Sequence, residues 1–149
     1  MLIRLQSEPF SPGAEVDAFS AYLSGAGALV TFTGVMRSSV ADPVIAMEIE
    51  HYPELAQAQI TEFAEMAINR FGLIDVGILH RHGLIFPGEP IMQVMASAPH
   101  RAEAFQAAEY LMDWLKTEAP FWKRETRPNG VSWVPQRDED DHARIRWKR

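Results

Sequence analysis

The side chains best suited to chemistry in this 149-residue sequence are two lysines near its C-terminal end. The sequence contains only three lysines, and two of them, Lys116 and Lys123, flank the segment 118–122. In a chain with a formal net charge of -6, this pair of cations favours a small anionic ligand. An ammonium group in a partly apolar pocket beside a second cation also releases its proton more easily, which would allow proton transfer or nucleophilic attack near neutral pH. The alternative is an ordinary lysine that complements the dipole of a helix end.

Two further positions place cationic side chains at the ends of expected elements. His100 and Arg101 follow Pro99, where a strand passes into a helix, and the unpaired N–H groups of a helix start favour phosphate or carboxylate. Arg37 follows the apolar strand sequence 28–35, a position suited to a bidentate contact with an anion. The alternative at each position is an ordinary solvated side chain.

Composition excludes several other kinds of chemistry. The chain has no cysteine, which rules out a thiol nucleophile, a thiolate metal site and any sulfur carried on this chain. His80 and His82 share a strand face but have no identifiable third ligand, so we expect no metal and no cofactor. A pI of 5.3 disfavours nucleic acid as a partner, and no apolar run reaches membrane-spanning length. No signal peptide is recognisable, so a cytoplasmic protein is expected.

The elements that must position these residues follow from apolar periodicity and turn signals. Helices are expected to begin at Pro12, at Pro53 and after Pro99, with Gly72 and Pro120 ending the second and third. The expected core face of the third helix is Phe105, Ala108, Met112 and Leu115. Strands are expected at 2–5, 28–35, 44–50, 74–81, 91–97, 121–126 and 131–134.

The order of these elements predicts the fold class. Strands 28–35 and 44–50 would form one hairpin, and strands 121–126 and 131–134 another around the turn Pro128-Asn129-Gly130. Hairpins interrupted by helices indicate a single α+β domain with mostly antiparallel sheet. We expect this domain to span 1–135, followed by a charged, mobile tail at 136–149.

Six sequence blocks, in this order and spacing, resemble the large, catalytic subunit of molybdopterin synthase. The resemblance covers about residues 1–135, and its last block is the most specific. The blocks are VTFTGVMR at 30–37, EHYP at 50–53, HRHG at 80–83, PGE at 87–89, APHR at 98–101 with AF at 104–105, and LK at 115–116 with APFWKRE at 119–125.

This resemblance implies a fold, an activity and partners. The fold would be of the α/β hammerhead type, with an additional C-terminal β-hairpin, in a homodimer that binds a small ubiquitin-like sulfur-carrier subunit at each end to give a heterotetramer. The enzyme would be a sulfurtransferase of molybdenum cofactor biosynthesis. It would transfer two sulfurs from the thiocarboxylate at the carrier's C-terminal Gly-Gly tail to cyclic pyranopterin monophosphate, which generates the dithiolene of molybdopterin.

The resemblance also implies roles for individual residues. Lys116 matches a lysine essential to catalysis, and Lys123 matches a second active-site lysine. The residues implied to contact substrate are Val35, Met36, Arg37, His100, Arg101, Lys116, Lys123, Arg124 and Glu125, with Phe32 and Met112 lining the pocket. His100 and Arg101 would reach the site across the dimer. The competing hypothesis is a non-catalytic scaffold that binds a ubiquitin-like partner or a phosphorylated metabolite.

Overall fold

Two four-stranded sheets and four α-helices make up the part of the chain described by the computed structural model, residues 1–135 and 138–148. No helix within those residues is long and apolar enough to cross a membrane. In chain order the elements are β1 (Leu2–Gln6), α1 (Pro12–Ser20), β2 (Ala28–Val35), β3 (Ala46–His51), α2 (Pro53–Phe71), β4 (Asp75–Arg81), β5 (Gly83–Ile85), β6 (Pro90–Ala98), α3 (Arg101–Thr117), β7 (Phe121–Arg127), β8 (Gly130–Trp133), α4 (Asp138–Ile145) and a 3₁₀ helix (Arg146–Lys148).

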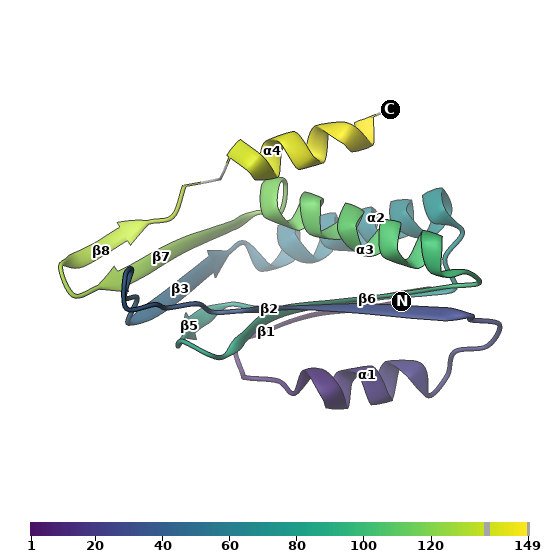
Figure 1. The fold of residues 1–149 in the computed structure, drawn as a ribbon, viewed down its shortest axis with the longest axis horizontal. Coiled ribbons are helices and arrows are strands. Elements are labelled where there is room, and N and C mark those ends of the chain that lie inside the picture. Colours follow the sequence, from purple (N-terminus) through teal and green to yellow (C-terminus); the bar gives the residue numbers. More distant parts are fainter. Residues whose placement is uncertain (136–137, 149) are drawn as a thin grey trace.

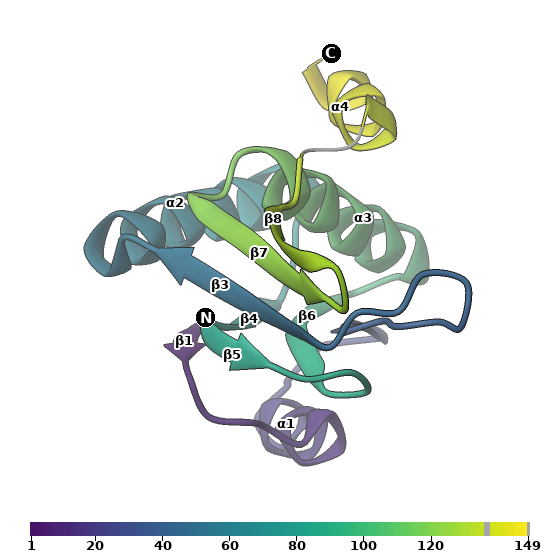
Figure 2. The same ribbon diagram turned by 90° about the vertical axis from the view of Figure 1, so that its left-hand side faces the viewer.

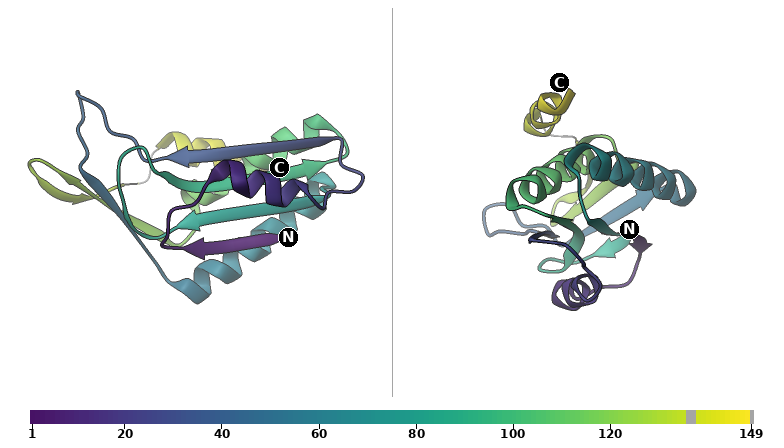
Figure 3. Two further views of the ribbon diagram at one scale, coloured as in Figure 1. Left: turned by 90° about the horizontal axis from the view of Figure 1, so that it is seen from below. Right: turned by 90° about the vertical axis from the view of Figure 1, so that its right-hand side faces the viewer.

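The first sheet has the strand order β1-β4-β6-β2. Strands β1 and β4 are parallel, whereas the pairs β4–β6 and β2–β6 are antiparallel. Helices α2 and α3 cover one face of this sheet and α1 lies against the other (Figure 1). Figure 3 shows the same arrangement from below, with α1 in front of the sheet and running roughly along its strands. The mostly antiparallel α+β class that the sequence predicts is confirmed.

The second sheet, of order β5-β3-β7-β8, lies at one end of the molecule, where its β7–β8 hairpin extends away from the helices (Figures 1 and 2). The predicted hairpin between β2 and β3 is wrong, because β2 pairs with β6 while β3 pairs with β5 and β7. Local alternation of side chains identifies a strand but not its partner, which long-range pairing decides. The predicted C-terminal hairpin is confirmed, with Arg127 paired to Gly130.

Helix boundaries agree closely with the sequence signals. The Ser11 hydroxyl accepts a hydrogen bond from the Ala14 N–H at the start of α1, and Pro12 occupies the first turn. Helix α2 begins at Pro53 and ends at Gly72, whose φ of 64° is left-handed. That conformation strongly favours glycine and closes the helix with a backbone N–H to the Ile68 carbonyl.

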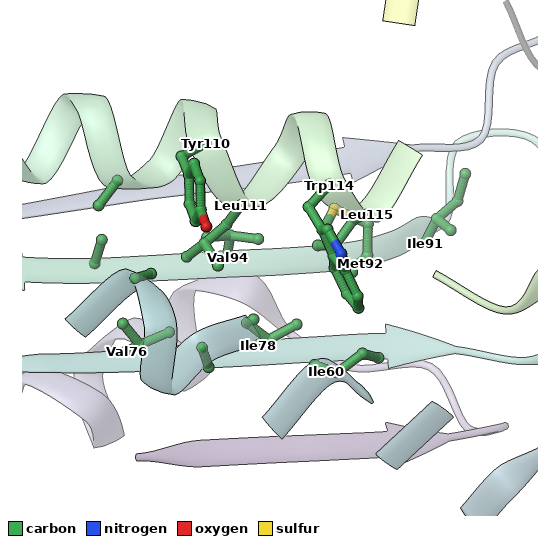
Figure 4. Close-up of a cluster of buried hydrophobic side chains, with 14 of the residues drawn as sticks. Ile60, Val76, Ile78, Ile91, Met92, Val94, Tyr110, Leu111, Trp114 and Leu115 are labelled. Carbon is green, nitrogen blue, oxygen red and sulfur yellow. The ribbon is translucent and has the colours of Figure 1, made fainter. Parts of the chain in front are cut away.

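The main core lies between helices α2 and α3 and the first sheet, where side chains of α3 face those of β4 and β6 (Figure 4). Helix α3 buries a face that contains Ala104, Ala107, Leu111, Trp114 and Leu115. Phe105, predicted to be in the core, is 62% exposed because this face is turned away from it. The predicted face and the buried face of α3 both contain apolar residues at helical spacing, so the sequence pattern alone does not show which of them is buried.

The C-terminal segment, for which the sequence predicts a mobile tail, is helical over residues 138–148. Arg146 pairs with Asp113 at 2.8 Å and with Glu109 at 2.6 Å, which fixes the segment against α3. Trp147 packs edge-on against Phe71 and Tyr110. The charges of this segment therefore include partners of acidic residues on α3 rather than only solvated groups. Gln136, Arg137 and Arg149 lie outside the described residues.

We expect Gly27 to be required for stability, because a Cβ atom at this position would collide with the backbone carbonyl oxygen of Pro99. Backbone on both sides would have to move, so Gly27→Ala should lower the free energy of unfolding by about 1–3 kcal/mol in urea denaturation. Gly13→Ala is the control, since nothing lies within 4 Å of a Cβ there. An unchanged urea midpoint for Gly27→Ala would contradict the close packing of β2 against the β6–α3 connection.

Candidate active site

Lys116 and Lys123, which the sequence singles out, lie in the walls of the same two cavities. Lys116 is in the last turn of α3 and Lys123 is in β7. The turn between them is fixed by backbone hydrogen bonds from Glu118 N–H to the Trp114 carbonyl and from Phe121 N–H to the Ala119 carbonyl. The structure therefore brings the two cations to one site.

The first cavity, of about 470 Å³, lies between the end of β2, strand β6 and helix α3. Besides the two lysines, four residues that the sequence assigns to the site gather here: Phe32, Val35, Arg37 and Met112. The full lining is Phe32, Thr33, Gly34, Val35, Arg37, His80, Ile91, Met92, Met112, Leu115, Lys116 and Lys123. The cavity thus combines three cationic side chains with apolar walls.

The second cavity, of about 340 Å³, lies between the α3–β7 turn, the end of β8 and helix α4. Its lining is His80, Leu115, Lys116, Thr117, Ala119, Phe121, Trp122, Lys123, Val134, Pro135 and Asp140. Asp140 brings a carboxylate from α4 to the cavity that also exposes Lys116 and Lys123. Because His80, Leu115 and both lysines border the two cavities, these residues form the wall between them.

The electrostatics of the site act most strongly on Lys123. Burial and, after it, the nearby charge of Lys116 lower the pKa of Lys123 to about 8, whereas Asp140 and Glu125 act in the opposite direction. An ammonium with this pKa is mostly charged at pH 7 but loses its proton when the pH rises slightly above neutral. Lys123 can therefore hold an anion near neutral pH and change its charge within an accessible pH range.

Two of the other residues assigned to substrate contact do not line either lysine cavity. Met36 is 2% exposed and packs in the core, where its backbone N–H bonds to the Glu89 carbonyl at 2.9 Å. Arg124 bonds to Glu48 at 2.7 Å and to Glu50 at 2.9 Å, and its guanidinium stacks over Trp133. Met36 therefore anchors the chain just before Arg37, and Arg124 occupies the face of β7 opposite Lys123.

Glu125 also lies beside the site without lining its cavities. Its carboxylate pairs with Arg127 at 2.5 Å, and its charge raises the pKa of Lys123. Glu125 projects from the same side of β7 as Lys123, because alternate residues of a strand share a face. Glu125 is therefore placed to tune the lysine rather than to enclose a ligand.

His100 and Arg101 lie at the opposite end of α3 from Lys116. A helix rises about 1.5 Å per residue, so Arg101 and Lys116 are separated by roughly 22 Å along the axis. Neither His100 nor Arg101 lines either lysine cavity. Within one copy of the chain, these two residues and the lysines form separate cationic regions.

His80 is the residue of the site that the sequence reasoning did not place there. Its side chain is 4% exposed and borders both cavities, and its ring stacks on Phe121 with centroids 4.0 Å apart. Apart from its place in the HRHG block, His80 stood out in the sequence only as one of two potential metal ligands. Among the described residues, no group of three potential metal ligands occurs. Its alternation with the core residues Val76 and Ile78 in β4 was the available signal that His80 points inward.

Comparison with known proteins gives consistent relatives across nearly the whole chain. A family model described as MoaE protein matches residues 5–118. A molybdopterin synthase catalytic subunit from Cereibacter sphaeroides is 50% identical over 147 residues, which cover 99% of this chain and 100% of the relative. Sequence similarity of this extent shows the family directly.

Solved structures agree with the sequence relatives. The molybdopterin biosynthesis MoaE protein from Burkholderia ambifaria superimposes with a TM-score of 0.83 at 44% identity, covering 98% of this chain and 97% of that one. A complex of subunits 1 and 2 of molybdopterin-converting factor from Helicobacter pylori contains the same fold, with a TM-score of 0.77 at 17% identity and 92% coverage of each chain. The chain therefore belongs to the MoaE family of molybdopterin synthase catalytic subunits.

Proposed function

We propose that the two lysine cavities are where this catalytic subunit transfers two sulfurs to cyclic pyranopterin monophosphate to form the dithiolene of molybdopterin. The observation that carries the proposal is the meeting of Lys116, Lys123 and Arg37 around one cavity of about 470 Å³ with apolar walls. Such a cavity suits a flat, anionic heterocycle, because its cations neutralise charge while its apolar side chains cover a ring.

The absence of cysteine determines how sulfur must enter. No thiol of this chain can hold sulfur, so sulfur has to arrive on another molecule. We assign this role to a small ubiquitin-like carrier with a C-terminal Gly-Gly thiocarboxylate. The thiocarboxylate is anionic, and the second cavity presents Lys116 and Lys123 to it. The shared wall between the cavities then brings donor and acceptor to the same two ammonium groups.

Each charged side chain has a distinct role in this proposal. Arg37 binds the phosphate of the substrate, and Lys123 holds the anion during transfer. Lys116 gives a proton to the oxygen that becomes negative when sulfur adds to carbon, and so stabilises the adduct. Phe32 and Met112 line the same cavity and cover the pterin ring.

The proposed assembly is a homodimer with one carrier at each end, a heterotetramer in the cytoplasm. The Helicobacter pylori structure with this fold is itself a complex of two different subunits. A second copy of the chain would also bring His100 and Arg101 near the lysines, since a two-fold axis can place the start of one α3 helix beside the end of the other.

Lys116→Ala should reduce dithiolene formation by at least about 100-fold, because loss of a positioned proton donor costs a factor of this size. The assay mixes the protein with thiocarboxylated carrier and cyclic pyranopterin monophosphate and measures the product. Lys148→Ala is the matched control, since the third lysine borders neither cavity. Near-normal turnover by Lys116→Ala with authentic carrier would refute the assignment, whereas an inactive wild-type protein that binds carrier would favour a scaffold.

The pH dependence should follow the ammonium of Lys123. If the charged form holds the anion, kcat/KM should fall as the pH rises through about 8, the value to which burial lowers the pKa of Lys123. Lys123→Arg should remove this alkaline fall, because a guanidinium remains charged throughout the range. A wild-type rate that rises through pH 8 would show instead that the neutral amine is the active form.

Sites built from two copies should recover activity when two inactive variants are mixed. Lys116→Ala and the double variant His100→Ala with Arg101→Ala would each lack one part of every site. After unfolding and refolding together, the mixture should regain about a quarter of wild-type activity, because half of random dimers are mixed and each has one intact site. Refolding each variant alone is the control. Failure to recover activity, with mixed dimers demonstrated, would place both parts of the site on one chain.

A further inference from the structure

One side chain that lines the two lysine cavities, that of His80, differs in chemistry from the charged ones. His80 lies at the end of β4, is 4% exposed and borders both cavities together with Lys116 and Lys123. The lysines and Arg37 can only donate hydrogen bonds. A neutral histidine offers a nitrogen lone pair as well, so it is able to accept a hydrogen bond from a donor group of a bound molecule.

The tautomer of His80 is fixed by its neighbours. Its Nδ1 atom lies 2.8 Å from the backbone carbonyl oxygen of Arg81, and because a carbonyl oxygen only accepts, Nδ1 carries the hydrogen and donates it. The ring is held parallel to Phe121, with an interplanar angle of 10°. Nε2 is therefore the atom with the free lone pair, on a ring that packing keeps in one orientation.

This lone pair is present at neutral pH. Burial, followed by the charge of Lys123, lowers the pKa of His80 to about 3, and Lys116 and His51 act in the same direction. His80 is thus neutral near neutral pH, where Lys123 carries its positive charge. Among the described residues, the only hydrogen bond found for the His80 ring is the one made by Nδ1, so Nε2 can accept from a donor that enters the cavities.

We propose that His80 is a further substrate-binding residue, whose Nε2 accepts a hydrogen bond from an N–H or O–H group of the bound heterocycle. This inference rests on the proposed function, since it concerns the same cavities. Phosphate and thiocarboxylate oxygens are repelled by a lone pair, so they remain with Lys116, Lys123 and Arg37. His80 instead selects the ring, because a ligand without a donor at this position would leave Nε2 unpaired.

The first test measures the tautomer on the wild-type protein without a carrier or turnover. In ¹⁵N-labelled protein, a two-dimensional spectrum of the imidazole nitrogens should show His80 as a neutral ring with hydrogen on Nδ1. The signal is assigned by its loss in His80→Phe or, if that variant does not fold, in His80→Gln. Adding a pterin monophosphate should shift the Nε2 resonance. Hydrogen on Nε2, or no shift of Nε2 when the pterin binds, would overturn the proposal.

The second test compares binding of two probes, a pterin monophosphate and inorganic phosphate, to His80→Phe. The phenyl ring keeps the stacking on Phe121 but has no lone pair, so affinity for the pterin monophosphate should fall about tenfold while affinity for phosphate stays unchanged. His82→Phe is the matched control, because His82 stacks on His51 and borders neither lysine cavity.

The outcomes separate this inference from the proposed function. Equal losses for both probes would show a structural role of His80, and unchanged pterin binding would show that Nε2 makes no contact with the ring, so either result would overturn the inference alone. A wild-type protein that binds phosphate but not the pterin monophosphate would count against both. The spectrum of the imidazole nitrogens is recorded on the wild-type protein, so it identifies the tautomer of His80 even if His80→Phe does not fold.

Discussion

The structure depends on holding two ammonium groups at one partly buried site. Lys123 loses hydration there and lies near the positive charge of Lys116, and the pKa of Lys123, lowered to about 8, is the visible consequence. Other interactions must offset this cost. The end of α3 is fixed in the core through Trp114 and Leu115, and β7 is fixed by a six-residue ladder to β3. Two independent parts of the fold thus carry one lysine each and converge on the site.

The core and the site share side chains, so the position of the cations is set by packing rather than by a mobile loop. Leu115, Met92 and Ile91 belong to the main hydrophobic cluster and also line the larger cavity. A close-packed interior has few alternative arrangements, so side chains on its boundary hold their geometry. His80 extends this pattern, because its inward position in β4 places one polar side chain at the end of a row that otherwise contains Val76 and Ile78.

Sequence reasoning succeeded where the signal is local and failed where distant segments choose their partners. Pro12, Pro53 and Gly72 mark helix ends through their own backbone preferences, and these positions are confirmed. The β2–β3 hairpin was wrong because pairing partners are chosen across the whole fold. The lysine pair was found because rare residues clustered, whereas the place of His80 in the site depends on where β4 packs against β7 and α3, which no local pattern records.

The length of α3 limits what one copy of the chain can do. Lys116 and Arg101 lie at opposite ends of a 17-residue helix, so no single small molecule contacts both within one copy. Strand β2 is an edge strand of its sheet, and it exposes Phe32 and Val35 beside the larger cavity. Edges with exposed apolar side chains are usually covered in natural proteins. A second copy against this edge would both protect the strand and bring the start of another α3 helix toward the lysines, so that stability and a complete site would come from the same contact.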